Sequence, residues 1–194
     1  MLKYRDYISW SQLSTWERDP NLYYEVYILG LDRVLTKAME LGKKVAEALE
    51  TQDEKRDPMM NYLITFLPTL SSREHELNVV VDSIKLKGRF DAFDPKTLDL
   101  IEYKTGANYT QGMANKLGQI DFYCLMIWLK YHKMPKSIRL IWAKTVEDKY
   151  GGRKLTGDFK VFKVKKSLRD VIKIVGRIKK AKMGIDEMKK TLSI

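Results

Sequence analysis

The sequence predicts an α/β domain in which helices flank a central mixed β-sheet. Residues 88–106 place two apolar-containing runs around a Pro-containing turn, which is typical of a β-hairpin. Residues 113–131 follow a helical period and lead into the apolar run 138–142, which predicts a helix followed by a buried strand. A strand–helix–strand crossover makes its strands parallel, whereas a hairpin makes them antiparallel, so the sheet is expected to be mixed.

Length and composition favour one intracellular domain. The chain has 194 residues, of which 44% are apolar and 31% charged, and residues 1–194 are most simply a single domain. No apolar run has the length of a membrane span, and residues 1–6 lack the apolar region of a signal peptide. The lone Cys124 excludes an intrachain disulfide. We therefore expect a protein of the reducing cytoplasm without membrane partners.

The N-terminal third is expected to be helical. The predicted helices span about residues 9–18, 20–29, 36–54 and 59–67. Ser9 or Ser11 can cap the first helix, and Pro20 can open the second. Trp10 and Trp16 are expected to pack in the core rather than to stack on bases.

The rest of the chain supplies the sheet and its covering helices. Residues 71–76 are expected to form a polar link in which His75 has no special role, and a β-rich run begins at Leu77. The further predicted elements span about residues 84–94, 98–106, 113–131, 138–144, 159–165 and 168–183. Gly184 is expected to end the last helix, because glycine commonly follows a helix C-terminus.

The predicted hairpin gathers three charged residues on one face. If residues 95–96 form the loop, Asp91 lies opposite Leu100. Side chains alternate along a strand, so Glu102 and Lys104 share the face of Leu100 and of Asp91. A loop one residue longer would turn Asp91 to the opposite face.

Two carboxylates beside an ammonium have a chemical use. Mg²⁺ and Mn²⁺ prefer oxygen ligands, and Mg²⁺ is typically held by one or two carboxylates together with water and phosphate. A nearby lysine can orient the attacking water and offset the charge that develops on a phosphate. The alternative is an ordinary solvated face of a hairpin.

Three motifs follow one another in the predicted strands and helix. They are Gly88–Asp91, Ile101–Gly106 with its E-x-K-T-G pattern, and the pair Gln119 and Tyr123 on the following helix. Together they resemble the PD-(D/E)xK nuclease superfamily, in particular its RecB-like exonuclease branch. Residues 9–16 are similar to the opening helices of that branch. The resemblance covers roughly residues 9–145 and implies a restriction-endonuclease-like core.

The same resemblance implies roles for the charged face. Asp91, Glu102 and the backbone carbonyl of Tyr103 would bind Mg²⁺ or Mn²⁺, and Lys104 would position the water that attacks phosphorus. Asp91, Glu102 and Lys104 are thus the candidate catalytic residues.

The sequence departs from the branch at two points. The metal-binding histidine of the first motif is replaced by Ala46, and the adjacent Glu47 is a candidate substitute. The alternative for Glu47 is an exposed helix carboxylate, and both interpretations stay open. Some members of the branch bind an iron–sulfur cluster through four cysteines, which a chain with only Cys124 excludes.

Nucleic-acid contacts are expected from two regions. Gln119 and Tyr123 lie four residues apart on one helix flank, where they could hold a DNA strand or form a partly buried polar flank. The whole net charge of +11 resides in residues 149–194, a basic strand–helix segment, while the preceding residues balance to zero. This asymmetry favours nucleic-acid binding through Lys173, Arg177 and Lys180, although a lysine-rich solvated helix is the alternative.

These expectations combine into one functional prediction and one rival. The prediction is a Mg²⁺- or Mn²⁺-dependent deoxyribonuclease, an exonuclease rather than a site-specific endonuclease, which acts in DNA recombination, repair or processing. Single- or double-stranded DNA is the expected partner, a recombination or replication protein is a further candidate, and a phage origin stays open. The rival is a nuclease-fold protein that binds nucleic acid or a partner without cutting, which Ala46 supports.

Overall fold

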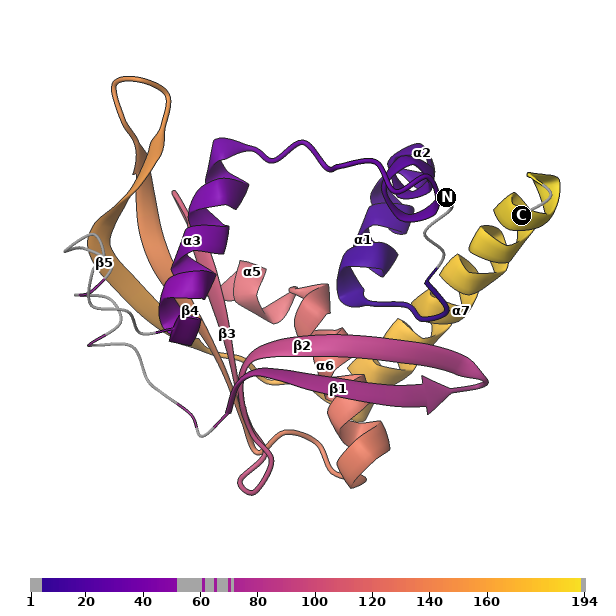
Figure 1. The fold of residues 1–194 in the computed structure, drawn as a ribbon. Helices are drawn as coiled ribbons and strands as arrows, with labels where there is room; N and C mark the ends of the chain where they lie inside the picture. The colour runs from indigo at the N-terminus through magenta and orange to yellow at the C-terminus, as the bar shows by residue number, and fades with distance from the viewer. Residues whose placement is uncertain (1–4, 52–60, 62–64, 66–69, 71, 193–194) are drawn as a thin grey trace.

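One five-stranded sheet organises the molecule. The computed structural model describes residues 5–51, 61, 65, 70 and 72–192 (Figure 1). The sheet order is β1-β2-β3-β4-β5, with β3 and β4 parallel and every other neighbouring pair antiparallel. The strands are β1 (Ser72–Val81), β2 (Ile84–Asp94), β3 (Asp99–Gly106), β4 (Ser137–Glu147) and β5 (Arg153–Lys163). The predicted α/β fold with a central mixed sheet is confirmed.

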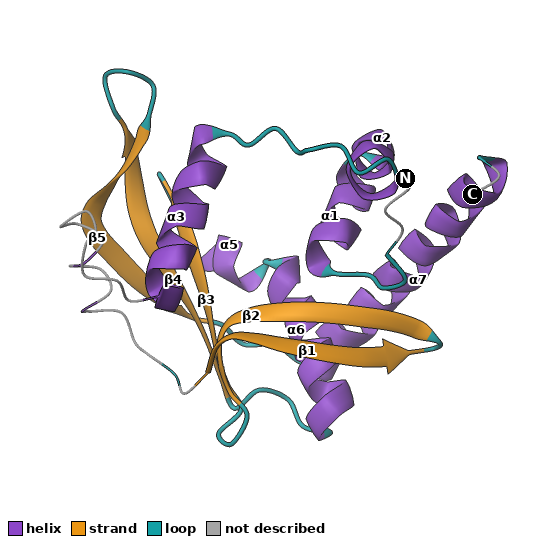
Figure 2. Ribbon diagram, viewed as in Figure 1, coloured by secondary structure: helices purple, strands orange, loops and turns teal. Residues whose placement is uncertain are grey.

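Helices cover both faces of the sheet (Figure 2). The helices are α1 (Trp10–Arg18), α2 (Pro20–Tyr23), the π-helix η1 (Tyr24–Ile28), α3 (Lys37–Thr51), α5 (Gln111–Asn115), α6 (Gly118–Tyr131) and α7 (Leu168–Thr191). Helix α3 packs on β3 and β5, whereas α6 packs on β1 and β2 and is itself covered by α7. Within the described residues, no helix combines the length and apolar character that crossing a bilayer requires.

The two faces have separate apolar clusters. The larger cluster lies between the sheet and α6 and includes Leu100, Leu140 and Phe162. The smaller one lies under α3 and includes Val45 and Ile101. Consecutive residues of β3 therefore point to opposite layers, as the alternation of side chains in a strand requires.

The β2–β3 hairpin is longer at its tip than the sequence suggests. Asp94 pairs with Asp99, and Leu98 adopts a left-handed backbone with φ of 58°. The Asp94 carboxylate accepts hydrogen bonds from the backbone N–H groups of Lys96 and Thr97, which stabilises the turn. The loop thus has four residues instead of the predicted two, and the predicted strand register is wrong by two residues. A shift of two residues preserves the face on which each side chain lies.

Two further boundaries differ from the prediction. Residues 72–76 belong to β1, and His75 stacks on Phe90 at 6.1 Å between ring centroids. This strand lies at the edge of the sheet, where Glu76 is exposed. The helix predicted over 113–131 is divided into α5 and α6. The short helix predicted over 59–67 falls mostly outside the described residues.

Gly184 does not end the last helix. Helix α7 continues through it to Thr191. A Cβ at Gly184 would lie 2.6 Å from Cζ2 of Trp16, so glycine is required here by the close approach of that indole ring. The prediction from helix-capping statistics was wrong because the reason for this glycine is a contact with a residue far away in the sequence.

Candidate active site

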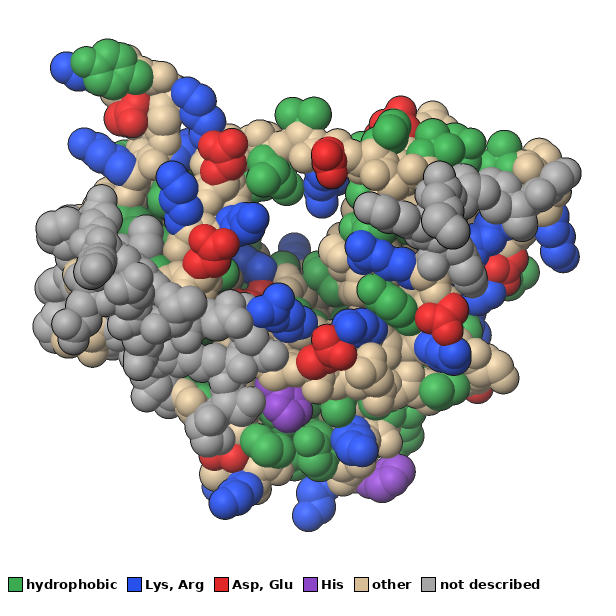
Figure 3. All heavy atoms as spheres, viewed as in Figure 1, with side chains coloured by type: hydrophobic (Ala, Val, Ile, Leu, Met, Phe, Trp, Pro, Cys, Tyr) green, Lys and Arg blue, Asp and Glu red, His purple; other side chains and the backbone are tan. Residues whose placement is uncertain are grey.

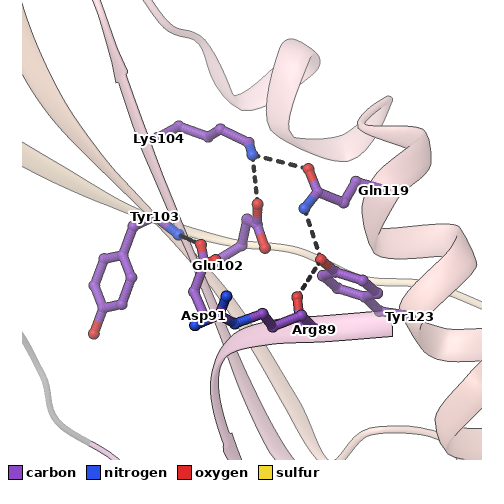
Figure 4. Close-up of polar contacts among 7 residues, drawn as sticks. All are labelled: Arg89, Asp91, Glu102, Tyr103, Lys104, Gln119 and Tyr123. Atoms are coloured by element: carbon purple, nitrogen blue, oxygen red, sulfur yellow. Dashed lines mark hydrogen bonds and ion pairs between the residues drawn. The ribbon is translucent and has the colours of Figure 1, made fainter. Parts of the chain in front are cut away.

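Asp91 and Glu102 meet where β2 separates from β3. The ladder between the two strands runs from Asp94 only as far as Ala92 and Ile101. Beyond it, the Asp91 carboxylate accepts a 2.8 Å hydrogen bond from the backbone N–H of Tyr103, so a side chain replaces the strand-to-strand bond (Figure 4). The local separation of the strands thus directs the Asp91 carboxylate toward β3.

Glu102 is a fully buried carboxyl group. Its exposed fraction is 0%, and its Oε2 atom has no hydrogen-bond partner among the described residues. Burial and then the negative charge of Asp91 raise the pKa of Glu102 to about 8. Burial likewise raises the pKa of Asp91, although Lys104 and the Tyr103 N–H oppose the shift. Two neighbouring carboxyl groups with raised pKa values favour a bound proton or cation between them.

Lys104 lies beside this pair. Its ammonium donates to Glu102 Oε1 and, over 2.8 Å, to Gln119 Oε1 on α6. Burial acts to lower the pKa of Lys104, but the charges of Glu102 and Asp91 outweigh it, so the pKa is raised. Lys104 is therefore an ammonium at neutral pH, which suits it to hold a water or a phosphate oxygen.

A chain of hydrogen bonds fixes the position of Lys104 (Figure 4). Gln119 Nε2 donates to the Tyr123 hydroxyl over 2.8 Å, and that hydroxyl donates to the carbonyl of Arg89 over 2.6 Å. Tyr123 is only 4% exposed. The two helix residues predicted to contact DNA are thus brought to the site, but their polar groups bond protein atoms and orient Lys104.

The other predicted residues lie elsewhere. Glu47 is exposed on α3. This helix packs through Val45 on the face of β3 that carries Ile101, opposite to the face of Glu102. The role of Glu47 as a metal ligand stays a prediction. Lys173 and Lys180 are exposed on α7, as a nucleic-acid surface requires.

Arg177 differs from its two basic neighbours on α7. Its guanidinium forms a bidentate salt bridge with Glu17, with hydrogen bonds of 2.8 and 2.6 Å, and lies 5.5 Å from the Trp10 ring centre. This contact joins α7 to α1, so the charge of Arg177 is already balanced.

The donor set of the pair fits a hard divalent cation. Among the described residues, no group of three or more His, Cys, Asp or Glu side chains is placed to hold a metal ion. Asp91 and Glu102 nevertheless supply the two carboxylates that Mg²⁺ commonly uses, and the unpartnered Glu102 Oε2 is an acceptor that a cation would satisfy.

Figure 3 shows Lys and Arg side chains around a hollow between α3 and the N-terminal helices.

Two aromatic residues lie near the site without a role in it that the sequence predicts. The charges of Lys104 and Glu102 act on Tyr109, whose pKa is raised chiefly by burial. Trp142 pairs with Lys104 across the parallel β3–β4 ladder. The apolar run 138–142 predicts a buried strand that contains Trp142, but only the register between the strands places it beside Lys104.

Solved structures share this fold at low sequence identity. A "putative exonuclease" from Eubacterium rectale has a TM-score of 0.60 at 11% identity, and the alignment covers 94% of this chain and 79% of that chain. A phage-related exonuclease from Haemophilus somnus 129PT has a TM-score of 0.55 at 10% identity, with 94% and 81% covered. No protein-family model matches the chain, and no curated protein matches its sequence.

Proposed function

We propose that the protein is a metal-dependent deoxyribonuclease of the PD-(D/E)xK type, an exonuclease of the RecB-like branch that acts in DNA recombination, repair or processing. The motifs Gly88–Asp91 and Ile101–Gly106 support the family. The names of the two structural neighbours, a "putative exonuclease" and a phage-related exonuclease, support the activity.

One observation carries the proposal. Glu102 is a buried carboxyl whose Oε2 has no donor among the described residues, next to a second carboxyl and an ammonium. Burying such a group costs free energy unless something compensates its charge, so a protein retains it for structure or for chemistry. Lys104 compensates the charge at Oε1, but no described residue donates to Oε2, so we assign this group to chemistry.

The roles follow from position. Asp91, Glu102 and the carbonyl of Tyr103 would hold Mg²⁺ or Mn²⁺, which supplies Lewis acidity toward the phosphate and lowers the pKa of bound water. Lys104 holds the attacking water and offsets negative charge that gathers on the phosphate oxygens. Gln119 and Tyr123 are positioning residues in this scheme, because they fix the ammonium without touching the substrate.

A direct assay tests the function. The purified protein is incubated with single- and double-stranded DNA in the presence of Mg²⁺ or Mn²⁺, and acid-soluble nucleotides are measured. We expect release that depends on the metal and stops in EDTA. The absence of release with either metal and either substrate would refute the nuclease assignment.

A second candidate function rests on Ala46. This residue stands where the branch carries a metal-binding histidine, and Glu47 beside it is exposed. A protein with the same fold that binds nucleic acid without cutting it would retain the surface and lose the metal. Under this alternative the assay above yields no acid-soluble product, whereas a separate binding measurement with the same DNA detects a complex.

A further inference from the structure

A row of three donor-bearing side chains crosses the sheet from the candidate active site to the edge. Lys104 on β3 pairs with Trp142 on β4, and Trp142 pairs with Lys160 on β5. Residues paired directly across strands lie on the same face, and adjacent strands are about 4.8 Å apart. The row therefore begins beside Glu102 and runs about 10 Å to the edge strand.

The middle member of the row carries an unused hydrogen-bond donor. The Trp142 indole is only 9% exposed, and its Nε1–H has no partner among the described residues. A Cβ at Gly106 on β3 would lie 3.5 Å from Nε1. Because residue 106 is glycine, no side chain from this position lies against the enclosed N–H, and an added methyl group would contact it.

The outer end of the row is a positive charge beside aromatic rings. Lys160 is exposed, and its ammonium lies 5.3 Å from the ring centre of Phe162. The Tyr109 ring lies 5.8 Å from the same ring. The residues of the row thus offer an ammonium, an N–H and a second ammonium in sequence, without a carboxylate between them.

We propose that this row is a phosphate track. In it the Trp142 Nε1–H donates to an oxygen of the phosphate next to the scissile one, and Lys160 binds the phosphate after that. The bound ligand is the sugar-phosphate backbone of a single strand. The proposal rests on the nuclease function, because it takes Lys104 as the contact to the scissile phosphate.

The chemistry of the row favours phosphate over other ligands. A buried N–H without a partner costs free energy that an anionic oxygen recovers. Two lysines flank it at the spacing of neighbouring strands, which suits a repeating anion rather than a single one. The N–H is recessed and Lys160 is exposed, so the strand descends from the edge of the sheet to the site. A duplex holds its phosphates on the outside of a wide cylinder and does not reach a recessed donor.

Two kinds of variant separate the members of the track. Trp142→Phe removes the N–H and retains an aromatic ring, whereas Gly106→Ala leaves the indole intact and covers its N–H. Lys160→Gln removes the outer charge. Lys163→Gln is the matched control, because Lys163 lies on the same strand, is exposed, and points to the opposite face.

The test is binding of a short fluorescein-labelled single-stranded DNA, followed by anisotropy in EDTA over a range of salt concentrations. Trp142→Phe and Gly106→Ala should each lower the affinity roughly tenfold without changing the salt dependence, because a neutral donor releases no counterion. Lys160→Gln should reduce the slope of log affinity against log salt by about 0.7, the value for one phosphate bound on a single strand. Lys163→Gln should do neither.

Each outcome decides the proposal. Wild-type affinity in both Trp142→Phe and Gly106→Ala would overturn it, as would equal slopes for Lys160→Gln and Lys163→Gln. If Trp142→Phe does not fold, as judged by circular dichroism, Gly106→Ala carries the same test. If the variants change affinity and salt dependence as expected but no acid-soluble product forms, the phosphate track is supported and the nuclease function is refuted. If DNA is cleaved but the variants bind like the wild type, the nuclease function is supported and the phosphate track is refuted.

Discussion

Replacing Glu102 with glutamine should remove a pH-dependent loss of stability. The pKa of Glu102 is about 8 in the folded protein, against an ordinary value of 4.5. Between these pH values the folded state keeps a proton that the unfolded chain has released. The free energy of unfolding of the metal-free protein therefore falls as pH rises through this window and levels off above about pH 8.

The size of this loss follows from the shift. One pKa unit corresponds to about 1.4 kcal/mol, so the loss by pH 9 is on the order of 5 kcal/mol. The raised pKa of Asp91 acts in the same direction. Glu102→Gln is neutral at every pH, and its amide oxygen still accepts from Lys104. The variant should therefore be more stable than the wild type at pH 9 and differ little from it at pH 5.

Urea unfolding followed by circular dichroism in EDTA at pH 5, 7 and 9 measures the effect. Glu40→Gln is a suitable control, because Glu40 is an exposed carboxylate on α3. Added Mg²⁺ should restore the stability of the wild type at pH 9 but leave Glu102→Gln unchanged, because the ion binds only the folded carboxylates. Parallel pH profiles for wild type and Glu102→Gln would refute the reasoning.

Three other predictions concern residues outside the central pair. Glu47→Ala should lower cleavage roughly tenfold with unchanged thermal unfolding if this carboxylate completes the metal site; a wild-type rate would show that two acidic ligands suffice. Combined charge reversal, Lys173→Glu with Lys180→Glu, should lower DNA affinity and reduce the salt slope by roughly 0.7–0.9 for each phosphate that is no longer bound, and an unchanged slope would place the DNA elsewhere. Gly184→Ala should lower the free energy of unfolding by about 1–3 kcal/mol, because its methyl group overlaps an indole ring. Gly176→Ala on the same helix has nothing within 4 Å and should raise it by about 0.5–1 kcal/mol; equal effects of the two would contradict the close approach of Trp16.

The sequence predicts the face of the hairpin correctly even though its register is wrong. Asp91 and Glu102 come together because the true loop is longer than the assumed one by two residues, and side chains repeat every two residues along a strand. The turn itself depends on Leu98 in a left-handed conformation, which a leucine rarely adopts. Local turn preferences therefore did not reveal it.

Contacts between distant residues could not be read from local patterns. The Tyr123 hydroxyl bonds the carbonyl of Arg89, which no spacing within α6 indicates. The pairing of Arg177 with Glu17 joins residues even farther apart in the sequence, so a basic residue that looked available for DNA is instead a link between two helices. The helical period predicts which face of a helix is buried, but the partner of each polar group depends on how the helices pack.

The place of Trp142 illustrates the same limit. Its apolar neighbours predict a buried strand, and the structure confirms a strand there. The orphan N–H and its position beside Lys104 arise from the parallel register of β3 and β4, which the crossover helix sets. The strand was therefore predictable and its part in the site was not.

The central claim is that Asp91, Glu102 and Lys104 form a metal-dependent cutting site. Its most direct test compares wild type, Lys104→Ala and Asp91→Ala in the release of acid-soluble nucleotides with Mg²⁺, alongside calorimetric titration of Mg²⁺ or Mn²⁺. Lys104→Ala should lose turnover but still bind metal and DNA, because the ammonium serves the transition state more than the ground state, whereas Asp91→Ala should lose metal binding as well. Cleavage by Lys104→Ala at the wild-type rate would show that Lys104 is not the catalytic ammonium of a nuclease.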